Sequence, residues 1–141
     1  MKVMVDTNVL VSAVLSADNR FVWLLDHITR FHRLVLSRAT LEELRTLFET
    51  RFAHRAPALE GLLRIMPFEV ADVPTVIVAS EYPSIRDLSD LPILASAIAS
   101  NVELFITGDK DFLSLQTDRL RIVSPTDSFR ILSFPQPSSE C

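Results

Sequence analysis

The sequence predicts a single α/β domain with a central parallel sheet covered by helices on both faces. Short β-branched or aliphatic runs alternate with helical patterns along all 141 residues, and no repeat or linker divides the chain. The composition is 48% hydrophobic and 23% charged, which is typical of a globular protein that can bury a core without disulfides.

Short apolar runs predict the strands. Residues 2–5 form a nearly continuous apolar run, as expected for a parallel strand that is buried on both faces. Further strands are expected at 34–36, within 68–73, at 104–107 and at 120–123. Pro74 interrupts the β-branched stretch that continues to Ala79, so an irregular connection should follow the third strand.

Apolar residues spaced three and four positions apart predict the helices. Two sets with this spacing are Phe21, Leu24, Leu25 and Ile28, and Leu59, Leu62, Leu63 and Met66. Other helices are expected from about Asn8, between Leu41 and Phe52, at about 91–100 and near 127–132. The proline- and serine-containing residues 133–141 are predicted to form a disordered tail.

Composition excludes several protein classes. No apolar run approaches the roughly 18 residues that span a bilayer, and Asp6 and Asn8 interrupt the apolar stretch of an export signal. We therefore expect a cytoplasmic protein without membrane contact. The single cysteine, Cys141, cannot form an internal disulfide or complete a zinc site with three scattered histidines. The net charge of −4 disfavours a nucleic-acid coat protein but permits a metal-dependent enzyme acting on phosphates.

Acidic residues follow two of the predicted strands. Asp6 comes directly after the first strand, and Asp109 lies two residues after Thr107. In open parallel sheets, functional groups collect outside the carboxyl ends of the strands. Each acid also has a structural explanation, because Asp6 could cap the next helix and Asp109 could form a turn with Gly108.

Helix geometry identifies Asp90 as a third candidate. At 100° per residue, Asp90 points at the centre of the apolar face of the helix at about 91–100. The alternative is an acid that stabilises the first turn, with Ser89 as the N-cap. Asp87 lies just before this helix and is more simply a cap or turn residue.

Glu43 is the fourth candidate. It lies at the border of the apolar stripe of its helix, whereas Glu42 lies opposite that stripe. The alternative is a capping box, in which Thr40 caps the helix and Glu43 binds back to its first turn. Four arginines could bind phosphate groups or could be solvated and paired with acids, namely Arg45, Arg51, Arg55 and Arg64.

The four acids require a counter-charge if they converge. Two carboxylates about 6 Å apart repel by roughly 3 kcal/mol at an effective dielectric near 20. Several such pairs would offset the whole stability of a small domain, about 5 to 15 kcal/mol. Carboxylates without histidine or cysteine select Mg²⁺ or Mn²⁺ rather than zinc, and such ions support phosphodiester cleavage.

Four segments together resemble the PIN-domain family. They are 5–12 (VDTNVLVS), 41–44 (LEEL), 90–97 (DLPILASA) and 105–112 (FITGDKDF). They look most like bacterial relatives of VapC, which are toxins of toxin–antitoxin pairs. The resemblance runs from Met1 to about Leu132, so 1–132 is predicted to be a PIN domain. It implies a three-layer α/β/α fold, Mg²⁺- or Mn²⁺-dependent RNA cleavage, a homodimer and an inhibitory antitoxin.

The resemblance also implies roles for individual residues. By position, the metal ligands and catalytic residues would be Asp6, Glu43, Asp90 and Asp109. The residues that orient ligands or substrate would be Asn8, Ser12 and Thr107, and the first two lie one helical turn apart. Asp111 could assist or replace Asp109, and Asp87 could share the role of Asp90.

Two other functional classes compete with this interpretation. A haloacid-dehalogenase-like phosphatase and a response-regulator receiver also place Asp after the first strand. The phosphatase needs a second Asp where this chain has Asn8, and the receiver needs an Asp after the middle strand, where Ser37 follows Leu36. The second competing class is a PIN-like domain that serves as a non-catalytic scaffold.

Overall fold

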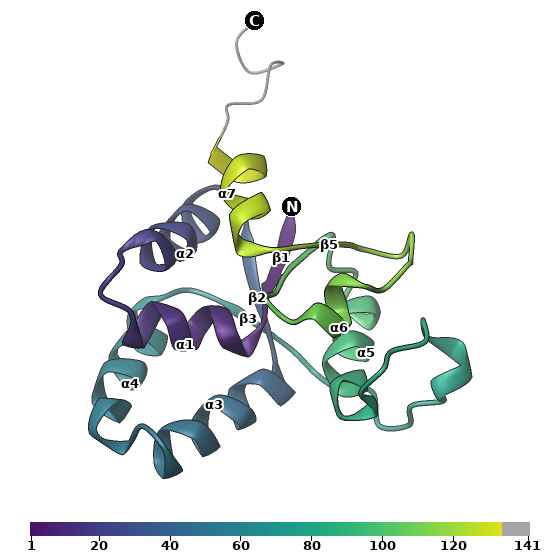
Figure 1. Cartoon of the computed structure of the whole chain (residues 1–141), viewed down its shortest axis with the longest axis horizontal. Coiled ribbons are helices and arrows are strands. Elements are labelled where there is room, and N and C mark those ends of the chain that lie inside the picture. The colour runs from purple at the N-terminus through teal and green to yellow at the C-terminus, as the bar shows by residue number, and fades with distance from the viewer. Residues whose placement is uncertain (134–141) are drawn as a thin grey trace, which may run out of the picture.

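A five-stranded sheet lies between two layers of helices in the computed structural model, which describes residues 1–133 (Figure 1). The sheet is parallel throughout and has the order β3-β2-β1-β4-β5. The strands are β1 (Lys2–Val5), β2 (Arg33–Ser37), β3 (Glu69–Ala71), β4 (Leu104–Ile106) and β5 (Arg121–Val123). Central β1 pairs Val3 with Leu34 on one side and with Leu104 on the other. The predicted three-layer α/β/α class is confirmed.

Helices connect every pair of consecutive strands, and the helix between β4 and β5 is the short α6. The α-helices are α1 (Thr7–Leu15), α2 (Arg20–Phe31), α3 (Arg38–Thr50), α4 (Ala56–Ile65), α5 (Leu91–Ala99), α6 (Lys110–Leu113) and α7 (Pro125–Ser133). Three 3₁₀ turns are η1 (Ala53–Arg55), η2 (Ala79–Glu81) and η3 (Leu88–Asp90). Within residues 1–133, none of the helices is long and apolar enough to cross a lipid bilayer.

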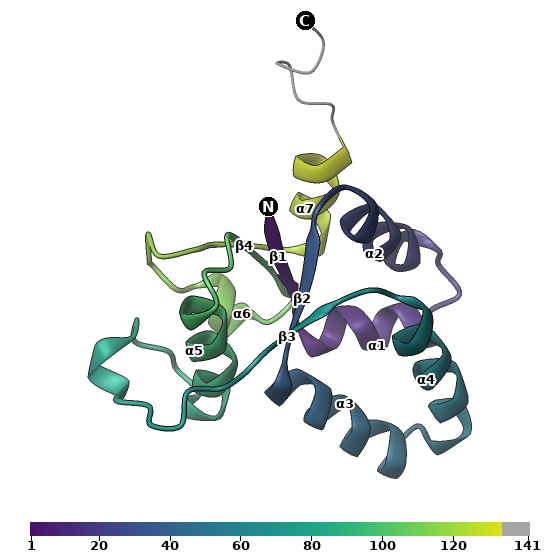
Figure 2. The same cartoon turned by 180° about the vertical axis from the view of Figure 1, so that it is seen from behind.

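Both faces of the sheet are covered, which explains the continuous apolar runs in its strands. Val3 and Val5 pack into a core cluster with residues of α1, α2, α3 and α4, whereas Met4 packs into a second cluster with residues of α5. Figures 1 and 2 show α1, α2 and α4 on one side of the strands and α5 and α6 on the other. A strand between two such layers needs an apolar side chain at successive positions.

The start of α3 differs from the capping-box alternative. Ser37 at the end of β2 is the N-cap, and its hydroxyl oxygen accepts a hydrogen bond from the Ala39 backbone N–H at 3.2 Å. Thr40 therefore lies inside the first turn, where its buried hydroxyl has no hydrogen-bond partner among the described residues. Because the helix starts three residues earlier than a capping box with Thr40 would require, Glu43 is not needed to cap it.

Two segments near the C-terminus differ from the prediction. Residues 110–113 form the short helix α6, which was not among the helices expected from the sequence. The last helix begins at Pro125 rather than near Asp127, because proline lacks an N–H and fits the first turn of a helix. This helix extends to Ser133, the first residue of the predicted tail, and residues 134–141 lie outside the described residues.

We predict that Leu44→Ala lowers the free energy of unfolding by about 2–5 kcal/mol, because it leaves a cavity in the core beneath α3. Leu44 is 0% exposed, next in sequence to Glu43. The matched control is Ile65→Ala, at a side chain that is 79% exposed, which should change the free energy by less than about 0.5 kcal/mol. Urea unfolding measures both, and equal losses would contradict the core position of Leu44.

Candidate metal centre

An open cavity of about 350 Å³ lies at the carboxyl ends of β1 and β4, between α1, α3 and α5. Its walls contain all four acids that the sequence singled out, namely Asp6, Glu43, Asp90 and Asp109. They also contain Asn8 and Ser12 from adjacent turns of α1. The structure therefore brings together side chains that are more than 100 residues apart in the chain.

Asp6 is the most deeply buried of these acids, at 4% exposure. One carboxylate oxygen, Oδ1, accepts a hydrogen bond from the Thr7 backbone N–H at 2.8 Å. The other oxygen, Oδ2, accepts from the Thr107 hydroxyl at 2.6 Å and from the Asn8 side-chain amide at 3.2 Å. Asp6 thus caps α1, as the structural explanation required, and also faces the cavity.

Thr107 and Asn8 connect the ends of β1 and β4. The Thr107 oxygen that donates to Asp6 also accepts a hydrogen bond from the Asp109 backbone N–H at 3.0 Å. Asn8 Oδ1 accepts from the Gly108 backbone N–H at 3.0 Å, and a Cβ at Gly108 would lie 3.3 Å from that oxygen. Glycine permits this close approach. The two polar side chains therefore hold Asp6 and Asp109 in a defined relation.

Asp109 has both a structural and a cavity-facing role. It is the N-cap of α6, and its Oδ1 accepts from the Asp111 backbone N–H at 2.9 Å. The other oxygen, Oδ2, makes no hydrogen bond within residues 1–133, and the residue lines the cavity. Asp111 does not line this cavity; its carboxylate lies 3.9 Å from the Arg86 guanidinium.

Asp90 and Asp87 differ in their hydrogen bonds. Asp87 caps η3, where its carboxylate accepts from the Ser89 backbone N–H at 3.0 Å and from the Ser89 hydroxyl at 2.7 Å. These bonds hold the pKa of Asp87 below its ordinary value. Asp90 occupies the N-cap position of α5, which was expected for Ser89, but its side chain makes no capping hydrogen bond. A capping role therefore does not account for Asp90.

The acids influence one another electrostatically. Partial burial, followed by the charges of Asp109, Asp87, Asp6 and Glu43, raises the pKa of Asp90 to about 6. Burial also raises the pKa of Asp6, although the hydrogen bonds from Thr107 and Thr7 oppose it, and the charges of Glu43 and Asp109 add to the increase. The pKa values of Asp6 and Asp90 are therefore both raised in part by the charges of the other acids that line the cavity.

Among residues 1–133, no cationic side chain is paired with the four acids of the cavity, although Arg51 also lines it. Elsewhere in residues 1–133, acids such as Asp18, Asp26 and Glu69 form ion pairs with arginine at 2.6–2.9 Å. None of the four cavity acids forms an ion pair within that part of the chain. An uncompensated set of carboxylate oxygens, without histidine or thiolate, fits a hard divalent cation.

A second group of acids shares Asp90 with this cavity. Carboxylate oxygens of Asp87, Asp90 and Asp111 lie within 4.8 Å of one another. The 3₁₀ turn explains why Asp87 lies close to Asp90, because its three-residue period places these two residues on the same side. The sequence analysis had named Asp87 as a possible partner of Asp90 and Asp111 as a possible partner of Asp109. It did not predict that Leu47 and Phe52, apolar residues of the predicted helix, line the cavity.

Comparisons with known proteins identify a family for this chain and solved structures with a similar fold. The PIN-domain family model matches residues 3–118. A chain of the Rickettsia felis VapBC2 structure, bound to a DNA fragment from their promoter, aligns with a TM-score of 0.65 and 17% identity over 88% of this chain and 98% of that chain. A chain of DNA-bound VapBC from Salmonella typhimurium aligns with a TM-score of 0.66 and 20% identity over 89% of this chain and 98% of that chain. A search of curated proteins found no match.

We predict that, in the presence of a chelator, the contribution of Asp90 to the stability of the protein is lost as the pH rises from about 4 to about 6. The pKa of Asp90 is about 6 in the folded chain against an ordinary value of 3.8, so the folded state binds the proton more tightly. Raising the pH through this interval removes that advantage, and Asp90→Asn should abolish this part of the pH dependence.

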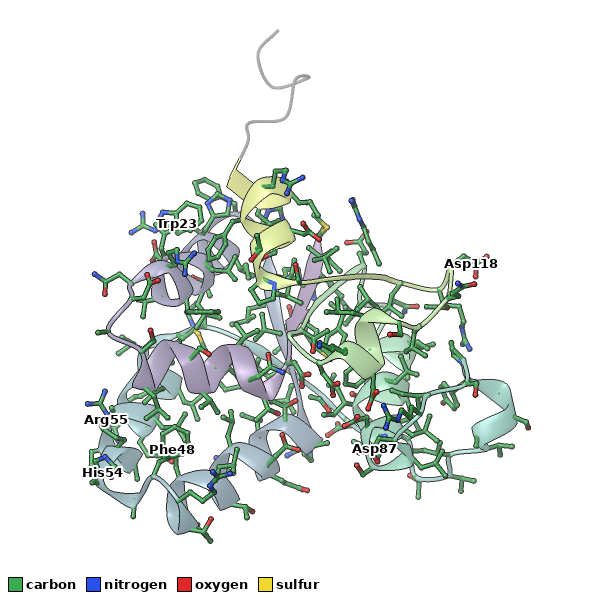
Figure 3. All side chains as sticks on the ribbon, in the orientation of Figure 1. Trp23, Phe48, His54, Arg55, Asp87 and Asp118 are labelled. Atoms are coloured by element: carbon green, nitrogen blue, oxygen red, sulfur yellow. The ribbon has the colours of Figure 1, made fainter. Side chains whose placement is uncertain are left out.

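Urea unfolding at several pH values measures this effect. The control is Asp118→Asn, at an exposed acid outside the cavity that Figure 3 labels on the loop before β5. It should retain the pH dependence of the unaltered chain. The same pH dependence in Asp90→Asn would contradict the assignment of the raised pKa to Asp90.

Proposed function

The chain belongs to the PIN-domain family, and we propose on this basis that it is a metal-dependent ribonuclease. The observation that carries the proposal is the meeting of four carboxylates in one cavity without a cationic partner in residues 1–133. In this proposal the metal ligands are Asp6, Glu43, Asp90 and Asp109.

The donor set favours Mg²⁺ or Mn²⁺. All four proposed ligands offer carboxylate oxygen, which is the donor preferred by these hard ions. The four carboxylates would hold such an ion, and its positive charge would activate a water and stabilise the phosphate oxygens during cleavage. Because ligands bind metal in their ionised form, cation binding would also favour deprotonation of Asp90, whose pKa is raised in its absence.

The surrounding residues have positioning roles in the proposal. Thr107 fixes the Asp6 carboxylate through a 2.6 Å hydrogen bond and the Asp109 backbone through a 3.0 Å hydrogen bond. Asn8 adds a second donor to Asp6, and Ser12 lies one turn further along α1 in the cavity wall. Asp111 and Asp87 would act through Asp90, whose carboxylate they approach.

We further propose that this nuclease is the toxin of a toxin–antitoxin pair. The resemblance of its motifs to VapC-related toxins and the fold similarity to two VapBC structures support this role. The proposal includes RNA as substrate, inhibition by a cognate antitoxin, a homodimer and a cytoplasmic location, each of which remains a prediction.

The phosphoryl-handling alternatives have less support. At the position of the second phosphatase Asp, Asn8 donates to Asp6 and accepts from Gly108, so it serves as an orienting amide. After the middle strand β2, Ser37 is buried and caps α3 in place of a receiver Asp. A non-catalytic scaffold would not explain why four mutually repelling carboxylates line one cavity. A cleavage assay tests the scaffold alternative directly.

We predict that the protein cleaves RNA with Mg²⁺ or Mn²⁺, that excess chelator stops the reaction, and that Asp6→Asn abolishes it. Loss of a direct ligand should exceed the roughly 10–100-fold loss that follows removal of outer-sphere partners. The assay is gel analysis of a labelled RNA, with circular dichroism to establish that the variant is folded.

The matched control is Asp72→Asn, at an exposed acid that pairs with Arg38 outside the cavity. It should cleave RNA at the rate of the unaltered chain. In bacteria, induced expression of the unaltered chain should slow growth, and Asp6→Asn should not. Chelator-resistant cleavage, or full activity in Asp6→Asn, would refute the proposed metal mechanism.

A second prediction concerns Thr107→Val, which keeps the side-chain shape but removes the hydroxyl. The Asp6 carboxylate would lose a donor and the Asp109 N–H an acceptor. We expect the affinity for Mn²⁺ to fall by about 10–100-fold, with cleavage partly restored at high Mn²⁺. Calorimetric titration measures the affinity, and Thr117→Val, at a threonine outside the cavity, is the control. Unchanged Mn²⁺ affinity would remove Thr107 from the positioning residues.

A further inference from the structure

The cavity that holds the acids has a second end with a different chemistry. The end of α3 contributes Leu47 and the C-cap residue Arg51, and Phe52 follows them. Val11 of α1 completes this wall. The guanidinium carbon of Arg51 lies over the Phe52 ring, 5.6 Å from its centre. One cavity therefore combines an acidic end with an apolar end that carries a cation.

The Arg51 side chain has no acceptor for its hydrogen-bond donors within residues 1–133. Its described side-chain interaction is the contact with Phe52, and no carboxylate lies within ion-pair distance. By contrast, Arg33 and Arg38 are paired with acids at 2.6 Å. A guanidinium carries five N–H donors in a planar fork, so the donors of Arg51, an exposed residue in the cavity wall, are available to a ligand.

The structure distinguishes Arg51 from the other three arginines that the sequence left open. Arg45, Arg55 and Arg64 do not line this cavity. Arg55 donates to the Val14 carbonyl oxygen at 2.6 Å, and Figure 3 shows it near the end of α1, on the opposite side of the view from Asp87. Of these four, Arg51 is the one placed to meet a ligand that enters the acidic cavity.

The spacing along α3 separates Arg51 from the proposed metal centre. Glu43, Leu47 and Arg51 follow one another at four-residue intervals and share one side of the helix. Eight residues at about 1.5 Å each place Arg51 about 12 Å along the axis from Glu43. Arg51 forms no ion pair with the acids, and its position along α3 separates a group bound by it from a group bound at the acids.

We propose that Arg51 binds a backbone phosphate of a nucleotide next to the cleavage position, and that Phe52 holds its guanidinium in place. This inference rests on the proposed nuclease function. The planar guanidinium matches the geometry of a phosphate, and stacking on an aromatic ring limits the freedom that it must lose on binding. A ligand that meets a cation site at one end and Arg51 at the other carries repeated negative charges along a chain, which describes single-stranded nucleic acid better than an acidic peptide.

The test is steady-state cleavage of a short labelled RNA at fixed Mn²⁺ and increasing KCl. For Arg51→Ala, KM should rise about tenfold while kcat changes little, because the lost contact is remote from the cleaved bond. The salt dependence of log(kcat/KM) should become shallower by about 0.7, the value for one phosphate contact on a single strand. Arg51→Lys keeps the charge but not the fork, so its salt dependence should stay unchanged and its KM should be intermediate.

The matched control is Arg45→Ala, at an exposed arginine on the same helix but outside the cavity. It should match the unaltered chain in KM and in salt dependence. Equal effects of Arg45→Ala and Arg51→Ala, or no effect of Arg51→Ala on cleavage, would overturn the inference. So would an Arg51→Ala variant that is altered only in binding a protein partner. If the unaltered chain does not cleave RNA, the proposed function fails instead. A DNA strand of the same sequence tests whether the contact with Arg51 depends on the sugar.

Discussion

Asp6 is a carboxylate that the fold places inside the protein, at 4% exposure, where the central strand ends and α1 begins. Removing such a group from water costs several kcal/mol unless hydrogen bonds and an opposite charge offset the loss. Thr7, Asn8 and Thr107 supply the hydrogen bonds. Within residues 1–133 no cationic side chain forms an ion pair with Asp6, and its burial raises its pKa, so the proposed cation would offset a charge that the fold leaves uncompensated.

The parallel sheet is what makes this arrangement possible. Because β1 and β4 are neighbours and run in the same direction, Asp6 and Thr107 leave the sheet side by side and Thr107 can reach both Asp6 and Asp109. On the other side of β1, the parallel strand β2 leads directly into α3, and this helix places Glu43 in the wall of the same cavity. Arg51 at the end of α3 lines the same cavity as Glu43 near its start. A single helix therefore contributes both to the proposed metal centre and to the proposed phosphate contact.

Structural and functional explanations of the acids are not exclusive in this protein. A carboxylate has two oxygens, and capping a helix occupies only part of its capacity as an acceptor. Asp6 caps α1 and Asp109 caps α6, yet both line the cavity. Helix capping in this case orients the carboxylate, because the bond to the backbone N–H limits its rotation. The Asp87 carboxylate accepts two hydrogen bonds from Ser89, whereas the Asp90 carboxylate makes no capping hydrogen bond and has a raised pKa.

The sequence by itself determined the α/β class, the strands and the location of Asp6 and Asp109, because apolar runs are local signals and parallel strands end at a common edge. It also identified Asp90 and preferred Glu43 to Glu42 from helix periodicity. Only the tertiary structure decided that Ser37 rather than Thr40 starts α3, that Asp87 and Asp111 approach Asp90, and that Arg51 alone of four candidate arginines enters the cavity. Those outcomes depend on where helices begin and on how segments distant in sequence pack together. Periodicity predicts which side of a helix is buried, but not which element that side contacts.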